Sequence, residues 1–230
     1  MSRFAVFLPL LLACSSCGGS SATAPSSADP EPVLSTASAQ PVREGGTQAA
    51  PPPGEGQAVA IFAGGCFWCM EGPFEELEGV FSVLSGYAGG PEIGPTYDEV
   101  SAHRTGHTEA IRVLYDPAVV TYERLLEVFW HNIDPTDGGG QFCDRGDQYR
   151  TAIFPQNDAE RSAAEASKSA IASQLGQPIA TRLEETDHFW IAEAYHQDFH
   201  RTNPSRYTRY RVGCGRDARL QELWGSSAGH

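Results

Sequence analysis

The segment 64–69 reads Gly-Gly-Cys-Phe-Trp-Cys, and no other stretch constrains the chain so strongly. The six small or apolar residues before it, 58–63, predict a short buried strand that ends at the glycines. Residues 70–77 are rich in helix formers, so we expect Cys66 at a strand-to-helix turn. The free N–H groups of a helix N-terminus favour a thiolate over a thiol. The segment therefore predicts an activated sulfur nucleophile, and the aromatic pair beside it predicts an apolar surface.

The Cys-x-x-Cys spacing is also compatible with a structural zinc site or a thioredoxin-type redox pair. Zinc would need two more ligands, but Cys143 and Cys214 are isolated and form no second pair in the sequence. His196 and His200 have a zinc-ligand spacing, yet Gln197 stands where the zincin pattern requires glutamate. We therefore expect no metal and no cofactor.

Charge and composition limit the class of protein. The 230 residues carry a formal net charge of −13, and no basic cluster occurs along the chain, which excludes a phosphate-binding footprint for nucleic acid. Hydrophobic residues make up 40% of the chain, enough for a real core. We expect one monomeric domain of ordinary size with an additional N-terminal segment.

The N-terminus resembles a targeting segment. Arg3 precedes a short apolar run, residues 4–12, that is too short to span a bilayer. The run ends in Leu-Leu-Ala-Cys, which resembles the lipobox of bacterial lipoproteins, so we expect lipidation at Cys14; an ordinary secretory signal is the alternative, and Cys17 has no such context. This predicts a protein of the cell envelope, anchored to a bacterial membrane by lipid and facing the periplasm or the exterior.

Domain boundaries follow from composition. Residues 18–57 are mostly glycine, serine, alanine, threonine and proline, which bury too little apolar surface to fold. The expected parts are a signal peptide (1–13), a lipidated N-terminus with a flexible linker (14–57), a catalytic domain (58–225) and a tail (226–230).

Within the domain, strands and helices alternate in mixed order, which predicts an α+β two-layer sandwich. The expected strands are 58–63, 81–87, 108–115, 149–154 and 179–184; the expected helices are 122–133 and 158–175. Residues 134–146 should form a loop, and periodicity fades from residue 201 onward, so we expect a long C-terminal coil over the domain.

Several motifs occur together in the order typical of one family. They are the Gly-Cys-Phe-Trp-Cys segment, 85–90 (Ser-Gly-Tyr-Ala-Gly-Gly), 95–97 (Pro-Thr-Tyr), 106–110 (Gly-His-Thr-Glu-Ala), 115–117 (Tyr-Asp-Pro), 144–150 (Asp-Arg-Gly-Asp-Gln-Tyr-Arg), 195–197 (Tyr-His-Gln) and 213–215 (Gly-Cys-Gly). From about residue 59 to 224 the chain resembles the A-type peptide methionine sulfoxide reductases. The resemblance implies a ferredoxin-like core with long irregular segments. It also implies reduction of methionine-S-sulfoxide, free or in oxidised proteins, and a thioredoxin-like reductant.

Cys66 is the expected nucleophile, and Glu109 is the best candidate for the acid that protonates the sulfoxide oxygen. In the strand 108–115, Glu109 shares a face with Ile111, Val113 and Tyr115. A carboxyl group on an apolar face is expected to have a raised pKa and so to keep its proton near neutral pH. From the residues alone, an edge glutamate turned to solvent is equally compatible with the pattern; the family's Gly-His-x-Glu-Ala motif favours the acid.

The resemblance implies the rest of the substrate site. Phe67 and Trp68 would receive the substrate methyl group, and the hydroxyls of Tyr97 and Tyr149 would donate to the sulfoxide oxygen. Asp144 resembles a family carboxylate that helps to fix substrate or water near the thiol.

After attack, Cys66 would carry a sulfenic acid, which condenses with a nearby thiol to a disulfide. Cys214 matches the family's C-terminal resolving position and is expected to act first, with Cys69 second and a relay through both also open. The role of Cys143 is open.

Two other functions are compatible with the cysteines. One is a membrane-tethered thiol–disulfide oxidoreductase that acts on protein disulfides through Cys66 and Cys69, and the other is an oxidant-sensing lipoprotein without catalysis. Glu109 and the two tyrosines argue against the first, because disulfide exchange has no oxygen to protonate; the second is the weaker alternative.

Overall fold

The computed structural model describes residues 46–229. The expected signal peptide, Cys14 and most of the expected linker lie outside the described residues. Within the described part of the chain, no helix combines the length and the apolar character needed to cross a membrane.

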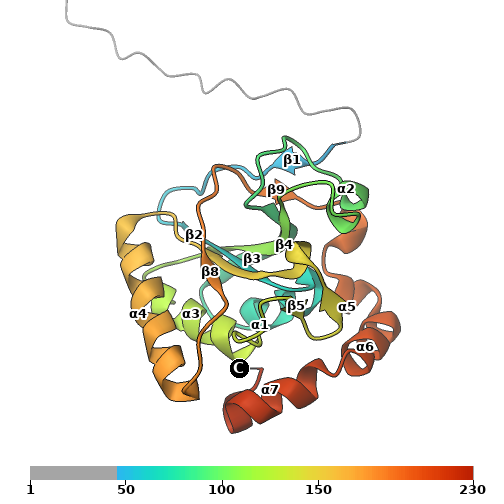
Figure 1. The fold of residues 1–230 in the computed structure, drawn as a ribbon. Coiled ribbons are helices and arrows are strands. Elements are labelled where there is room, and N and C mark those ends of the chain that lie inside the picture. The colour runs from blue at the N-terminus through green and yellow to red at the C-terminus, as the bar shows by residue number, and fades with distance from the viewer. Residues whose placement is uncertain (1–45, 230) are drawn as a thin grey trace, which may run out of the picture. The chain divides into compact units, whose positions relative to one another are not determined.

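A seven-stranded sheet forms the centre of the domain, in the order β1-β9-β3-β4-β2-β7-β8 (Figure 1). Neighbouring strands are antiparallel except for the parallel pair β7–β8. The four longest strands are β3 (Val80–Ala88), β4 (Thr108–Tyr115), β2 (Ala58–Gly64) and β7 (Thr151–Phe154); the short ones are β1 (Gln48–Ala49), β9 (Trp190–Ile191) and β8 (Arg182–Leu183). The expected strand 149–154 thus begins two residues late, and 179–184 shortens to two residues.

The period of two along the strands divides the apolar residues between the two faces of the sheet. On β2, Ala60 and Phe62 belong to the larger core, under the helices, whereas Ile61 and Ala63 belong to the smaller cluster on the opposite face. β4 pairs with β2 and divides in the same way. The α+β architecture is therefore as expected, with helices packed on one main face.

Helices that contribute to the larger core include α1 (Glu71–Glu75), α3 (Tyr122–His131) and α4 (Asp158–Leu175) (Figure 1). α3 begins at a Thr121 cap that accepts a hydrogen bond from the Arg124 N–H, and its Phe129 ring stacks on Phe62 with centroids 5.1 Å apart. The short helix α2 (Tyr97–Ser101) begins with a capping box formed by Thr96 and Glu99.

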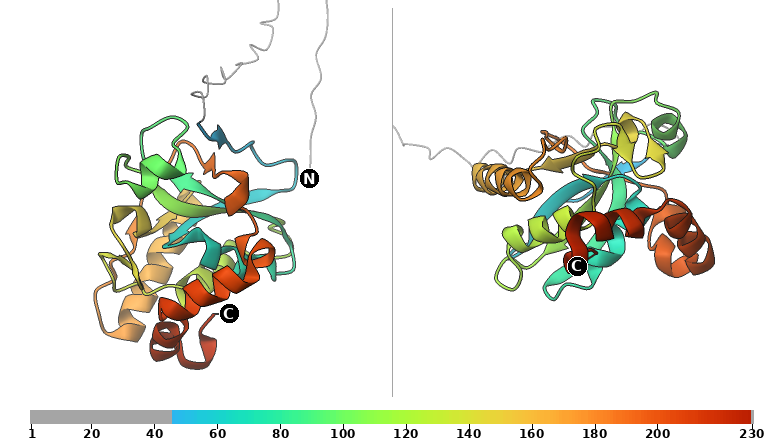
Figure 2. Two further views of the ribbon diagram at one scale, coloured as in Figure 1. Left: turned by 90° about the vertical axis from the view of Figure 1, so that its right-hand side faces the viewer. Right: turned by 60° about the horizontal axis from the view of Figure 1, so that its bottom comes forward.

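The expected C-terminal coil is wrong: the segment forms α5 (Phe199–Thr202), α6 (Pro204–Gly213) and α7 (Arg216–Trp224). Its periodicity is weak because α6 buries no residue, while α7 is anchored by only a few side chains. The Trp224 indole N–H donates to the Ile133 carbonyl at 3.0 Å, which holds α7 beside α3 (Figure 2). Tertiary contacts, rather than an amphipathic pattern, fix these helices.

The expected linker ends earlier than residue 57. β1 pairs with β9 through Gln48 and Ile191, and the Thr47 hydroxyl donates to the Pro95 carbonyl at 2.7 Å. The buried Arg112 guanidinium donates to the Pro51 carbonyl at 2.7 Å. Main-chain pairing at a sheet edge requires no apolar side chains. The polar composition of these residues therefore did not indicate that they are ordered against the domain.

Candidate active site

Cys66 lies two residues beyond the end of β2, after Gly65. Gly65 has φ +78°, and a Cβ there would lie only 2.5 Å from Gln141 Cβ, so the turn into the nucleophile requires glycine. The chain then enters the 3-10 helix η1 (Phe67–Cys69) and α1. The strand-to-helix turn is as expected, but its first helix is a single turn of three residues.

A small cavity of about 70 Å³ opens beside the Cys66 sulfur. Seven of the residues expected at the site line it together, although they come from separate segments of the chain: Cys66, Phe67, Trp68, Tyr97, Glu109, Asp144 and Tyr149. The eighth lining residue, Tyr210, was not predicted from the sequence.

Glu109 points from β4 into the core and is only 2% exposed, so the alternative of an edge glutamate in solvent is excluded. The Phe67 N–H donates to its Oε2 at 3.1 Å, which joins η1 to β4. Burial raises the pKa of Glu109 to about 8, with a further contribution from the Asp144 charge, against the Phe67 hydrogen bond. The carboxyl group is therefore largely protonated at neutral pH.

Two tyrosine hydroxyls complete the polar side of the cavity. Tyr97 comes from the start of α2, and Tyr149 ends the 3-10 helix η2 (Asp147–Tyr149). Burial, and then the nearby Glu109, raise the pKa of Tyr97 to about 12 and raise that of Tyr149 as well. Both hydroxyls are neutral donors over the whole physiological pH range.

The resting state of Cys66 differs from expectation. The thiol is 6% exposed, and burial, a hydrogen bond with Cys69 and the nearby Glu109 raise its pKa well above the usual range. The hydrogen bond from Cys66 lowers the pKa of Cys69 to about 6, with help from the positive charges of Arg216 and Arg211. One turn of 3-10 helix contributes too little to offset this burial, so Cys66 rests as a thiol and must lose its proton before it attacks.

Phe67 and Trp68 form the aromatic wall of the cavity, and the C-terminal segment packs against Trp68. Trp68 stacks on Phe199 with centroids 3.7 Å apart, and its indole N–H donates to His196 Nδ1 at 3.1 Å. His196 ends the 3-10 helix η3 (Ala194–His196), whereas His200 lies on α5 near Glu71 and Glu75. His196 therefore contacts Trp68 and His200 contacts the carboxylates of α1, so the two side chains are not paired as their zinc-ligand spacing allows.

Cys214 is not free in this structure: it forms a disulfide with Cys143, with Cα atoms 4.8 Å apart. The expected loop 134–146 contains a small hairpin of β5 (Gly140–Gln141) and β6 (Asp144–Arg145), which presents Cys143 at the surface beside Asp144. Cys66 and Cys69 are the free, buried cysteines of the described residues.

Three residues beyond the expected set support the site. Tyr210 donates a hydrogen bond to Asp144, His196 orients Trp68, and the buried Arg216 guanidinium donates to the Gly64 and Asn132 carbonyls at 3.0 and 2.8 Å. His196 was visible as part of a motif. Nothing in the sequence marks Tyr210 or Arg216 as close to Cys66.

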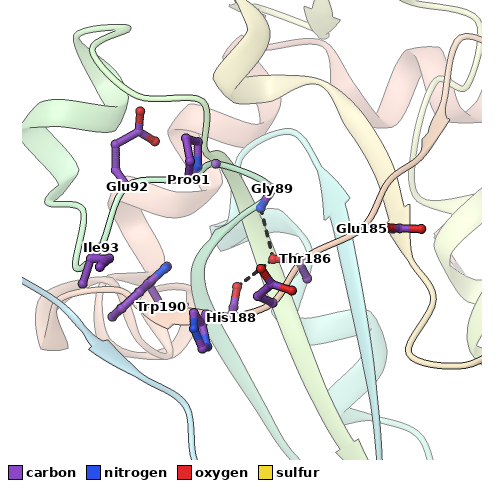
Figure 3. Close-up of a pocket in the computed structure, with 10 residues that line it drawn as sticks. Gly89, Pro91, Glu92, Ile93, Glu185, Thr186, His188 and Trp190 are labelled. Carbon is purple, nitrogen blue, oxygen red and sulfur yellow. Dashed lines mark hydrogen bonds between the residues drawn. The ribbon is translucent and has the colours of Figure 1, made fainter. Parts of the chain in front are cut away.

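A larger cavity of about 330 Å³ lies elsewhere, between residues 89–93 and 185–190 (Figure 3). The Gly89 N–H donates to the Thr186 hydroxyl across it, at 3.4 Å. Its ionisable lining is mainly carboxylates, from Glu92, Glu185 and Asp187, with no thiol. The reactive groups converge on the small cavity instead.

A buried thiol facing a protonated carboxyl group and two hydroxyls defines a thiol-dependent oxidoreductase. Residues 58–228 match the family model described as peptide methionine sulfoxide reductase. The chain is 53% identical over 173 residues to the peptide methionine sulfoxide reductase MsrA of Bacillus licheniformis, and 50% identical over 174 residues to that of Bacillus subtilis. These alignments cover 74% and 75% of this chain and 96% and 98% of the two relatives.

Solved structures give the same relationship. Reduced Mxr1 from Saccharomyces cerevisiae is 29% identical with a TM-score of 0.62, and covers 69% of this chain and 90% of its own. Methionine sulfoxide reductase A of Corynebacterium diphtheriae is 30% identical with a TM-score of 0.59, over 71% and 91% of the two chains. The chain belongs to the peptide methionine sulfoxide reductase family. It is an oxidoreductase that reduces methionine sulfoxide by way of a cysteine disulfide.

The raised pKa of Glu109 predicts a pH-dependent effect on stability. A carboxyl group whose pKa is higher in the folded state stabilises the fold at low pH, and this contribution is lost as the pH rises through the folded-state pKa. Between about pH 5 and 8, Glu109→Gln should gain stability relative to the parent by up to about 1.4 kcal/mol per pH unit. Urea unfolding of both proteins across this range measures the difference. A difference that stays constant with pH contradicts the assignment.

Proposed function

We propose that this enzyme reduces the S epimer of methionine sulfoxide, free and in proteins, with Cys66 as the nucleophile and Glu109 as the acid. The Cys66 thiolate takes the oxygen from the substrate, whose sulfur–oxygen bond breaks, while the Glu109 proton moves to that oxygen. Methionine leaves, Cys66 carries a sulfenic acid and Glu109 is left ionised.

The observation that carries this proposal is the composition of the cavity. One cavity of about 70 Å³ is lined by Cys66, by the Glu109 carboxyl group with its raised pKa, and by Tyr97 and Tyr149. A sulfoxide oxygen needs these donors, whereas a disulfide substrate has no oxygen to protonate. A general thiol–disulfide oxidoreductase would gain nothing from burying Glu109.

Epimer selectivity follows from the two unlike sides of the same cavity. Phe67 and Trp68 provide an apolar seat for the methyl group, and Glu109, Tyr97 and Tyr149 provide the donors for the oxygen. In the R epimer the methyl group and the oxygen exchange sites. The methyl group would then block hydrogen bonding at the donors, and the oxygen would lie unpaired against the aromatic rings.

Cys66→Ser should abolish reduction of methionine-S-sulfoxide with dithiothreitol, because a serine hydroxyl is not appreciably ionised and is a far weaker nucleophile. The parent enzyme should turn over the R epimer poorly. The measurement is methionine release from the separated epimers. Activity in the serine variant, or equal use of both epimers by the parent, contradicts the proposal.

For the second half of the cycle, Cys69 is the better resolving residue, which reverses the order expected from the sequence. Its sulfur is hydrogen-bonded to Cys66, whereas Cys214 is held in the bond to Cys143. The Cys69 sulfur displaces water from the Cys66 sulfenic acid and forms a Cys66–Cys69 disulfide. A thioredoxin-like dithiol then reduces this bond, directly or by exchange through the Cys143–Cys214 pair, of which Cys143 is exposed.

Peptide mapping after one turnover without reductant should find the Cys66–Cys69 bridge as the new disulfide. Cys69→Ser should retain one fast turnover and then recycle slowly with a thioredoxin-like reductant, which needs a disulfide to attack. Dithiothreitol should be less affected, since a small thiol can reach the sulfenic acid. A dominant Cys66–Cys214 bridge would instead make Cys214 the first resolving residue, as the sequence suggested.

The lipoprotein interpretation of the N-terminus also belongs to this proposal. It rests on the lipobox-like end of the apolar run at Cys14, so that the catalytic domain acts in the bacterial cell envelope on a lipid anchor. Cys14→Ala should abolish incorporation of a labelled fatty acid and release the protein from the membrane fraction. If Cys14→Ala is still labelled and Cys17→Ala is not, the lipid is attached to Cys17 and the assignment to Cys14 is wrong. If both variants are still labelled, the lipobox interpretation is ruled out.

A further inference from the structure

Cys66 requires an acceptor for its proton, because burial keeps the thiol protonated in the resting enzyme. Glu109 cannot serve as this acceptor in the mechanism above, since it must itself bring a proton to the substrate oxygen. Two other groups lie beside the Cys66 sulfur: the Cys69 sulfur and the hydroxyl of Tyr210, which lines the same cavity.

Tyr210 enters the cavity from α6, a helix that otherwise buries no residue. Its hydroxyl donates a hydrogen bond to Asp144 Oδ2, and Tyr210 lines the same small cavity as Cys66. Its ring packs edge-on against Trp68, with centroids 5.8 Å apart and planes at 82°. One hydroxyl bonded to a carboxylate therefore shares the cavity of the reacting sulfur.

The Cys143–Cys214 disulfide joins the two segments that carry this bridge. Cys143 is the immediate neighbour of Asp144, and the Cys214 N–H donates to the Tyr210 carbonyl at 2.9 Å, one helical turn away. The disulfide and the Tyr210–Asp144 hydrogen bond thus close a ring between the β5–β6 hairpin and α6. This cross-link holds both groups in place without requiring a packed core under α6.

We propose that Tyr210 is a catalytic residue that passes the proton of Cys66 to Asp144. The Cys66 S–H first turns from Cys69 to the Tyr210 oxygen. In one concerted step the Cys66 S–H bond then breaks and its proton binds the Tyr210 oxygen, while the Tyr210 O–H proton moves to the Asp144 carboxylate. The products are a Cys66 thiolate, a neutral Tyr210 and a protonated Asp144; no electrons are transferred. The step rests on the proposed role of Cys66 and supplies the thiolate that attacks the sulfoxide.

Asp144 is suited to accept this proton. Burial raises the pKa of its carboxyl group, although the Tyr210 hydrogen bond and the Arg216 charge act in the opposite direction. Asp144 is only partly buried, at the rim of the cavity, so its proton can exchange with water afterwards. Glu109, in contrast, is enclosed and keeps its proton for the substrate oxygen.

The test compares single-turnover methionine formation, without any reductant, in the parent, Tyr210→Phe, Asp144→Asn and the double variant. The two single changes should each slow this step by on the order of 10², the lower end for acid–base catalysis. Because the two residues act as one relay, the double variant should be no slower than the slower single variant. Tyr122→Phe is the matched control: it removes a buried hydroxyl from α3, outside the cavity, and should react at the parent rate.

Two results would overturn the relay. One is a parent-like rate in Tyr210→Phe; the other is a double variant whose loss is the product of the two single losses, which indicates independent roles. Cys69→Ala tests the competing acceptor: a loss of about 10²-fold in the single-turnover rate there, with none in Tyr210→Phe, assigns the proton to Cys69. Failure of the parent itself to form methionine refutes the proposed function instead, so the two failures are distinguishable.

Discussion

The hydrogen bond from the Phe67 N–H to Glu109 joins the two elements on which the site depends. It links the turn that carries Cys66 to a central strand of the sheet, and it is made to a carboxyl group that is almost fully buried. Burial favours the protonated carboxyl, and the single N–H donor offsets that preference only in part. This contact therefore positions the thiol beside a carboxyl group that burial keeps protonated.

This arrangement has a consequence for Cys66, because the enclosure that keeps Glu109 protonated also keeps the thiol protonated. Attack requires a negative charge on Cys66 that burial disfavours, so the thiol needs a group that accepts its proton. The structure supplies it from the C-terminal segment, where Tyr210 and Asp144 are joined through the Cys143–Cys214 disulfide. The C-terminal helices thus contribute chemistry as well as cover to the aromatic wall.

The sequence predicted those features that depend on local pattern. Strand alternation placed Glu109 on the apolar face of β4, and short motifs identified most of the cavity lining before any fold was known. It could not predict the position of Tyr210, because 144 residues separate it from Cys66 and α6 has no apolar stripe to signal its packing. The thiolate expectation for Cys66 was wrong for a related reason: helix-terminus arguments are local, whereas desolvation depends on the whole enclosure.

The central claim is that Glu109 holds a proton at neutral pH, and carboxyl-carbon NMR tests it most directly. Protein labelled with ¹³C at the glutamate side-chain carboxyl, compared with Glu109→Gln to identify the resonance, would be titrated between pH 4 and 10. The account predicts that the Glu109 signal changes near pH 8, as its buried environment requires. A midpoint near the ordinary glutamate value of about 4.3 would contradict it, since the carboxyl group would then have no proton to give.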